Sequence, residues 1–282
     1  MMRRTALAAA VFAAQLLAET PQTEEQLRGI VRKAIGGLRQ EDERRGQFLF
    51  KARSEHKELD AAGKVLNQRS HAWERIEIDG FPFGRTLERD GKPLTAEERK
   101  LEDAAMQKRL AELKAPKPAI AGASLESDSV SRPGGKSAQD EWFMEFPEAL
   151  NFKLLSEAAI DGRPAFHLEA LPKSGYRAKN IRARVFEKMK ATFWIDKASS
   201  ELVKADAEMF DTVSVGFGVL GKIEKGTRFR LQRRMVGTGE WLIESQSMRF
   251  SARILLFKTM RNESNTEWSE FRRRPKAMPA KP

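Results

Sequence analysis

Apolar and polar residues alternate with a period of two over most of the second half of the chain. This period is typical of β-strands that bury one face. Turn sequences such as Asp161-Gly162 and Gly237-Thr238-Gly239 separate the alternating segments at regular spacing. The predicted strands are residues 143–156, 164–171, 188–196, 201–210, 227–236, 240–250 and 253–260. Together they predict an antiparallel meander that curls into a barrel or an open half-barrel.

Two further alternating segments, residues 47–57 and 64–78, flank a turn at residues 60–63. A short glycine-containing turn between alternating segments predicts a hairpin. We expect the sequence Phe81-Pro82-Phe83-Gly84 to break the ladder after the second strand.

A helix is predicted over residues 23–45, where Thr23 and Gln26 have the spacing of a capping box. The apolar residues of this segment recur at steps of three and four, so they form one stripe that must lie against an apolar surface. They are Leu27, Ile30, Val31, Ala34, Ile35 and Leu38. A second helix, with a thin apolar face, is expected to begin at Thr95.

The apolar positions of the predicted strands lie on one face of a curved sheet. The helices can fill this face completely, as in any protein core, or they can leave a groove for acyl chains. Each buried methylene group would contribute about 0.8 kcal/mol to binding in such a groove. The groove hypothesis assigns ligand contacts to Phe48, Phe50, Trp73, Phe166, Leu168, Phe193, Ile195, Met209, Phe229, Leu231, Met248 and Phe250, and Val65 and Val203 share their face.

The expected fold is therefore mainly β, of the α+β class. It is an antiparallel curved sheet that forms an open half-barrel, with helices packed on its concave side. Residues 19–264 are expected to form this single domain. A flexible insert is expected around residues 115–139, which combine Pro and Gly with Ala, Ser and Lys. Residues 265–282 are expected to be a basic, proline-rich tail that follows a short terminal strand beginning at Ser264.

The first eighteen residues have the pattern of an export signal. Arg3 and Arg4 precede an almost uncharged apolar segment, and Ala18 offers a small residue for cleavage. The apolar run is too short to span a bilayer, which takes roughly 20 residues. We expect residues 1–18 to be removed and the mature protein to be soluble in the periplasm or secreted.

The composition limits the chemistry further. The chain has no cysteine, which excludes thiol catalysis, thiolate metal sites and a lipid anchor on an N-terminal cysteine. The formal charge of +11 suits anionic lipid or polyanionic envelope polymers better than nucleic acid, which an exported protein seldom meets. A basic, well-solvated surface without any partner explains the same charge.

Motifs for catalysis or cofactor binding are weak. Residues 216–221 match G-x-G-x-x-G, but the following segment alternates like a strand, whereas dinucleotide binding requires a helix there. His56, His71 and His167 are scattered singly, without metal-ligand spacing. We therefore expect no enzyme activity, cofactor or metal, although a hydrolase acting through dispersed carboxylates stays open.

Three arginines, Arg228, Arg230 and Arg234, share one face of a predicted strand. This basic face suits an anionic membrane surface. It is equally compatible with a solvated strand face that has no partner.

Short motifs of the chain resemble those of the LolA/LolB-type outer-membrane lipoprotein-sorting proteins. They are residues 160–166 (Ile-Asp-Gly-Arg-Pro-Ala-Phe), residues 171–173 (Leu-Pro-Lys) and residues 192–196 (Thr-Phe-Trp-Ile-Asp). The order of signal, early helix, hairpin, second helix and meander is also similar. The resemblance implies an unclosed barrel with helices on its concave side that holds lipid or acylated protein without catalysis.

Two hypotheses for function follow. The first is a periplasmic or secreted binding protein that holds lipid, acyl chains or an envelope lipoprotein in the apolar groove. The second is an envelope interaction module with a filled core that docks a protein or polymer through its basic face and the insert at residues 115–139.

Overall fold

The computed structural model describes residues 23–115, 144–215, 221–237, 239–254 and 258–275. The expected signal at residues 1–18 and nearly all of the insert expected at 115–139 lie outside these ranges, as do residues 216–220 of the glycine motif. The helices are α1 (Glu24–Arg39), α2 (Glu41–Arg45), α3 (Ala96–Lys114), α4 (Phe146–Ala149) and the 3₁₀-helix η2 (Ala183–Lys188). The strands are β1 (Phe48–Leu59), β2 (Val65–Ile78), β3 (Phe81–Arg89), β4 (Lys92–Pro93), β5 (Leu150–Ile160), β6 (Arg163–Pro172), β7 (Met189–Asp196), β8 (Leu202–Met209), β9 (Val213–Val215), β10 (Gly221–Ile223), β11 (Arg228–Val236), β12 (Glu240–Ile254) and β13 (Lys258–Arg273).

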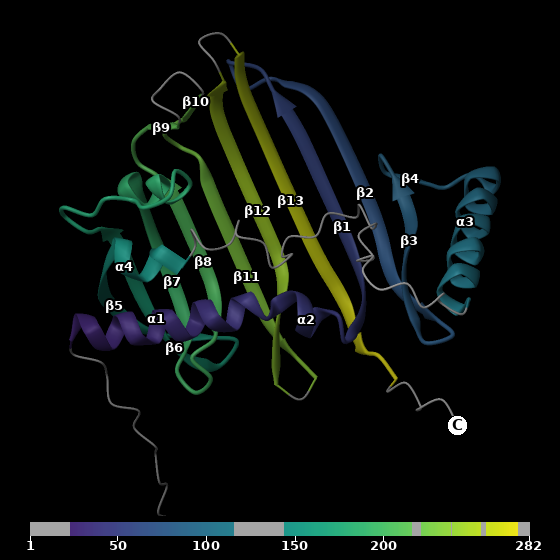
Figure 1. Cartoon of the computed structure of the whole chain (residues 1–282), viewed down its shortest axis with the longest axis horizontal. Helices are drawn as coiled ribbons and strands as arrows, with labels where there is room; N and C mark the ends of the chain where they lie inside the picture. The colour runs from purple at the N-terminus through teal and green to yellow at the C-terminus, as the bar shows by residue number, and fades with distance from the viewer. Residues whose placement is uncertain (1–22, 116–143, 216–220, 238, 255–257, 276–282) are drawn as a thin grey trace, which may run out of the picture.

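One antiparallel sheet contains all thirteen strands of the described residues. Its order is β4-β3-β2-β1-β13-β12-β11-β8-β7-β6-β5, with β9 and β10 attached beside β12. The strands β4 and β5 lie at the two ends of this order and do not pair with each other, so the sheet is open rather than closed into a barrel (Figure 1). The expected mainly β fold with an unclosed antiparallel sheet is confirmed.

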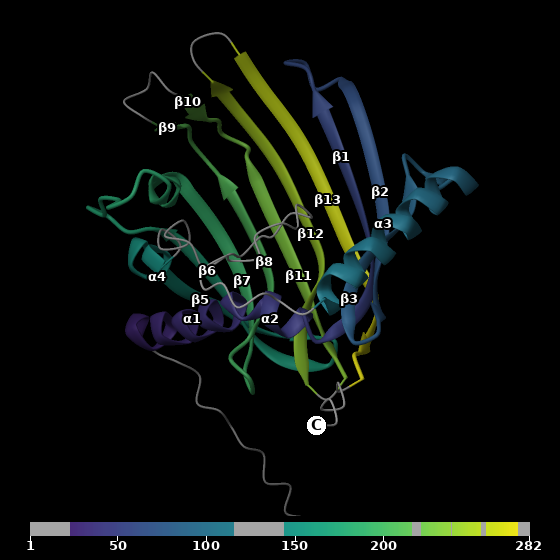
Figure 2. The same cartoon turned by 45° about the vertical axis from the view of Figure 1, so that its right-hand side comes forward.

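The helices α1 and α2 run across one face of the sheet, which we call the helix side (Figure 1, Figure 2). The opposite face is called the outer side. The hairpin predicted around residues 60–63 is present as β1 and β2. Both expected helix starts are also present, because Thr23 with Gln26 and Thr95 with Glu98 form complete capping boxes.

Three strand assignments from the sequence are wrong. Residues 146–149, which the sequence placed in the strand predicted over 143–156, form the helix α4, and β5 begins only at Leu150. Phe81–Gly84 does not break the ladder: it begins β3, which pairs with β2 from the pair Ile78 and Phe81 onward. The break expected after Phe250 is also absent, because β12 continues to Ile254. Strand β13 carries the sheet to Arg273, past the domain boundary expected at residue 264, and it pairs with β1 on one side and β12 on the other.

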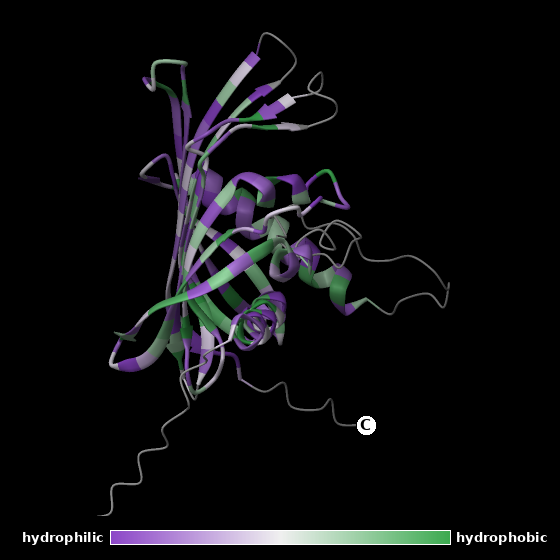
Figure 3. Cartoon of the chain, turned by 90° about the vertical axis from the view of Figure 1, so that its left-hand side faces the viewer, coloured by the Kyte–Doolittle hydropathy of each residue, from purple (hydrophilic) through white to green (hydrophobic). Residues whose placement is uncertain are grey.

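The main core lies between α1 and the strands β5 to β8, with β11 and β12 at its border. The apolar stripe of α1 supplies Leu27, Val31, Ala34 and Ile35, each at most 5% exposed. The sheet supplies Phe152, Leu168, Phe193 and Leu231 from the facing positions. Figure 3 shows this apolar layer beside the helices, while the far ends of the long strands are mostly hydrophilic.

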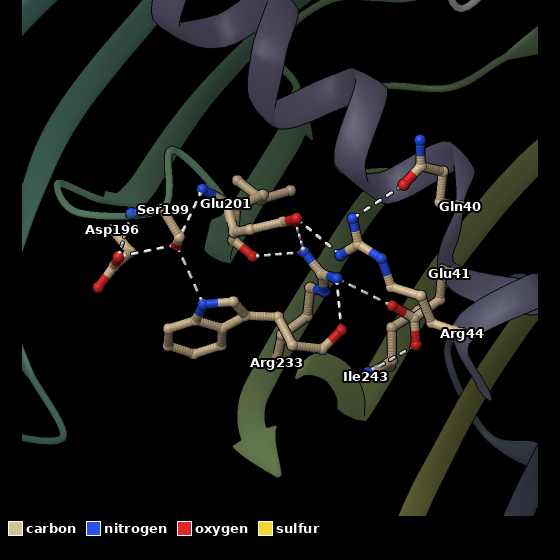
Figure 4. A network of polar contacts seen from close by, with 10 residues as sticks. Gln40, Glu41, Arg44, Asp196, Ser199, Glu201, Arg233 and Ile243 are labelled. Carbon is tan, nitrogen blue, oxygen red and sulfur yellow. Dashed lines mark hydrogen bonds and ion pairs between the residues drawn. The ribbon is translucent and has the colours of Figure 1, made fainter. Parts of the chain in front are cut away.

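A buried ionic network fixes α2 to the sheet (Figure 4). The Arg233 side chain is fully buried and lies 3.0 Å from the Glu41 carboxylate of α2 and 2.8 Å from that of Glu201. Arg44 binds the other oxygen of Glu201 at 2.6 Å. The second Glu41 oxygen accepts from the backbone N–H of Ile243 at 2.8 Å. Two guanidinium groups and two carboxylates therefore neutralise one another where the helices cross from one half of the sheet to the other.

Candidate functional site

The helices cover only part of the helix side. Strand pairing places Leu231 of β11, Gln246 of β12, Thr266 of β13 and Ser54 of β1 in one row across this face. One row further along the strands, Phe229, Met248, Ser264, His56 and Arg69 follow one another from β11 to β2. Both rows extend beyond the strands that α1 covers.

We call this uncovered part of the helix side the open patch. Its apolar members are Phe229, Met248, Phe250, Trp73 and Trp268, and its polar members are Ser54, His56, Glu58, Asn67, Arg69, His71, Gln246, Asn262, Ser264 and Thr266. Met248 is 37% exposed, and the other four apolar side chains are partly exposed. The patch is mainly apolar over β11 and β12 and mainly polar over β1 and β2.

Two tryptophans belong to the open patch. Trp268 packs against the main core, and the Arg45 guanidinium lies 5.4 Å from its ring centroid. Trp73 stacks on His71 with ring centroids 5.2 Å apart and an interplanar angle of 18°. Burial, with help from the positive charge of Arg89, lowers the pKa of His71 below its ordinary value. His71 is therefore held in its neutral form near pH 7.

The predicted groove residues fall into three groups. Phe166, Leu168, Phe193, Ile195 and Leu231 belong to the main core, where α1 packs over the sheet. Trp73, Phe229, Met248 and Phe250 lie on the open patch. Phe48, Phe50 and Met209 are buried elsewhere.

Phe48 packs with Val236 and Leu242 in a second cluster, apart from the main core. A bulge between Leu49 and Lys51 shifts the register of β1. Bulges change which residues face a given side of a sheet, so simple alternation cannot place Phe48 and Phe50 with the core.

The predicted basic face lies on the outer side and is largely neutralised. Arg228 forms a two-point ion pair with Asp206, at 2.5 and 2.7 Å, and Arg230 lies 3.3 Å from the same carboxylate. Arg234 pairs with Glu244 at 3.0 Å. Hydrogen bonds from Arg228 hold the pKa of Asp206 below its usual value, so this carboxylate stays ionised.

Sequence reasoning missed three kinds of residue in this region. Trp268 was assigned to the tail, and the row of His56 and Arg69 was not recognised. Arg233 was not singled out. Its position two residues after Leu231 was nevertheless a usable signal, because a charge in that alternation must find a buried partner.

Within the described residues, no group of three acidic or histidine side chains could hold a metal ion. No helix in those residues is long and apolar enough to cross a membrane.

Comparison with known proteins gives structural matches only. No family model matches the chain, and no curated protein matches it. A putative outer membrane lipoprotein-sorting protein domain from Vibrio parahaemolyticus is similar, with a TM-score of 0.35, 13% identity, and coverage of 91% of this chain and 96% of that one. A LolA superfamily protein from Nitrosomonas europaea has a TM-score of 0.28 and 14% identity over 86% of this chain and 94% of that one. MucB, in its complex with MucA from Pseudomonas aeruginosa, has a TM-score of 0.25 and 10% identity, with 86% and 94% covered.

These similar structures include the lipoprotein-sorting class that the sequence motifs resemble. Similarity at this level does not assign a ligand or a partner.

Proposed function

We propose that this protein is a non-enzymatic periplasmic or secreted binding protein that holds an acyl chain, as lipid or as acylated lipoprotein, on the open patch. The observation that carries the proposal is the continuation of the apolar core onto an uncovered surface. Phe229 packs against the main core, and its neighbour Met248 in the same row is 37% exposed. An acyl chain laid along β11 and β12 would extend the core instead of creating a new one.

The same patch supplies a place for the polar end of an amphiphile. Arg69 and His56 are direct cross-strand partners at its other side, and both are exposed. Arg69 forms no ion pair within the described part of the chain. An anionic head group there would meet an uncompensated guanidinium. The proposal includes no catalytic step.

The part of the predicted groove beneath α1 is not available in this arrangement. Phe166, Leu168 and Ile195 are at most 6% exposed, because the stripe of α1 packs over them. A ligand would reach them only if the ionic network around Arg233 opened and α1 moved away. We therefore place the ligand on the open patch.

Tryptophan fluorescence provides a direct test, because Trp73 and Trp268 lie on the patch. A fatty acid brominated along its chain, titrated into residues 19–282, is expected to quench part of the emission in a saturable way. Met248→Glu should weaken this quenching about tenfold, since it places a carboxylate where the acyl chain lies. Leu171→Glu is the matched control, because Leu171 is 44% exposed on β6, away from the patch.

Equal quenching in both variants would contradict the proposal, and so would a complete lack of saturable quenching in the unmodified protein. Either result would favour the alternative of an interaction module whose core is already filled.

A further inference from the structure

Strands β1, β2, β10, β12 and β13 each have an end at the same end of the sheet, the upper end in Figure 1 and Figure 2. Pairing fixes this arrangement: Leu59 lies between Val65 and Arg261, and Arg253 pairs with Lys222. We call the described residues at this end the sheet tip.

The sheet tip exposes two large aliphatic side chains at the start of β2, directly after a well-defined turn. Val65 is 44% exposed and Leu66 is 67% exposed. The Asp60 carboxylate accepts hydrogen bonds from the backbone N–H groups of Ala62 and Lys64, each at 2.8 Å. Gly63 has a φ of +87°, a conformation that favours glycine. Val65 and Leu66 follow this fixed turn directly as the first residues of β2, so two neighbouring aliphatic side chains are held exposed at the sheet tip.

Positive charge surrounds these side chains. Lys64, Lys222 and Lys258 are exposed, and none of the three forms an ion pair within the described ranges. Arg253 and Arg261 share a single carboxylate, that of Glu224, at 3.3 and 4.0 Å. Five cations therefore face few anions here, in contrast with the outer-side arginines, which are paired with Asp206 and Glu244.

We propose that the sheet tip docks on an anionic phospholipid bilayer. Val65 and Leu66 would enter the interfacial region, and the lysines would lie among the head groups. Aliphatic residues flanked by lysine and arginine are the combination that binds such interfaces, since burial and attraction to anionic lipid act together.

This docking is independent of acyl binding on the open patch. It differs from the membrane contact predicted from the sequence, which used Arg228, Arg230 and Arg234. The sheet tip presents an end of the molecule, whereas those arginines present a strand face.

Co-sedimentation with large vesicles tests the proposal on residues 19–282. Vesicles of phosphatidylglycerol and phosphatidylethanolamine should bind the protein, and vesicles of phosphatidylcholine alone should bind it much less. Leu66→Asp should lower the partition coefficient about tenfold. Leu101→Asp is the matched control and should leave it unchanged, because Leu101 is a 72% exposed leucine of α3.

Variants that remove positive charge test the electrostatic contribution to vesicle binding. The double change Lys64→Gln and Lys258→Gln should weaken binding to anionic vesicles by about fivefold for each charge removed. It should also reduce the salt dependence. Arg228→Gln with Arg230→Gln should have little effect.

The proposal would be overturned if the double variant Arg228→Gln with Arg230→Gln lost vesicle binding while Leu66→Asp kept it. Equal losses in Leu66→Asp and Leu101→Asp would also overturn it. Quenching by the brominated fatty acid should be normal in Leu66→Asp, so failure of the tip and failure of the open patch are distinguishable.

Discussion

Arg233 and Arg234 are consecutive residues of β11 with opposite environments. The Arg233 side chain is fully buried between two carboxylates and also donates to the carbonyl oxygens of Leu202 and Trp241, at 3.0 and 2.6 Å. The Arg234 side chain is 51% exposed and has one ion pair. Removing one partner of a buried ion cluster leaves the others charged without compensation, whereas exposed pairs contribute little.

We therefore expect Arg233→Ala to lower the free energy of unfolding by about 3–5 kcal/mol. Arg234→Ala should lower it by less than about 1 kcal/mol. Urea unfolding followed by circular dichroism measures both. Similar losses in the two variants would show that the Arg233 network does not hold α2 to the sheet in solution.

At the scale of single elements, α1 shows how a glycine can be required by the packing of a helix. A Cβ atom at Gly37 would overlap the Glu201 carboxylate, which Arg44 and Arg233 hold in place. A Cβ atom at Gly36, one residue earlier, would meet nothing within 4 Å. Alanine is otherwise the better helix former by roughly 1 kcal/mol.

Gly36→Ala should therefore raise the free energy of unfolding by about 0.5–1 kcal/mol. Gly37→Ala should lose this gain and destabilise the protein, because Glu201 must leave its ion pairs. Thermal and urea unfolding of both variants provide the comparison. A gain of equal size in both would mean that Glu201 is free to move and that the close approach of α1 is unimportant.

Elements whose position is set by neighbouring residues were predicted correctly from the sequence. The helix starts at Thr23 and Thr95 and the turn at residues 60–63 are of this kind, because each depends on residues only a few positions apart. Strand β3 was missed because Pro82 suggests a break. In the fold, β3 pairs with β2 on one side and meets β4 on the other only at Glu88 and Arg89, so a proline is tolerated at Pro82.

At the scale of the whole molecule, the open sheet and its helix side follow from the pattern, but the position of the open patch does not. How much of the apolar face the helices cover depends on where α1 ends and on where the Arg233 network holds α2 against the sheet. The Arg233 network depends on contacts between residues that are far apart in the sequence. The continuous strand β13 was not predicted for a related reason: its residues 262–267 are polar on both faces, which is possible only where the helix side is left uncovered.

The two halves of the sheet should also differ in stability. Strands β6 to β8 lie beneath α1 in the main core, whereas β2 and β3 contribute few buried side chains, among them Ala72 and Phe83. Segments with few buried contacts open at lower free energy than core strands. Hydrogen–deuterium exchange should therefore show faster exchange in residues 65–89 than in residues 163–209, apart from the loops. Adding an acyl ligand should slow exchange in β11, β12, β13 and β1, which form the floor of the open patch, and leave β5 and β6 unchanged. Ligand-induced protection confined to β5 and β6 would instead place the ligand beneath α1. Uniform exchange across the sheet of the ligand-free protein would contradict the division into a packed half and an uncovered half.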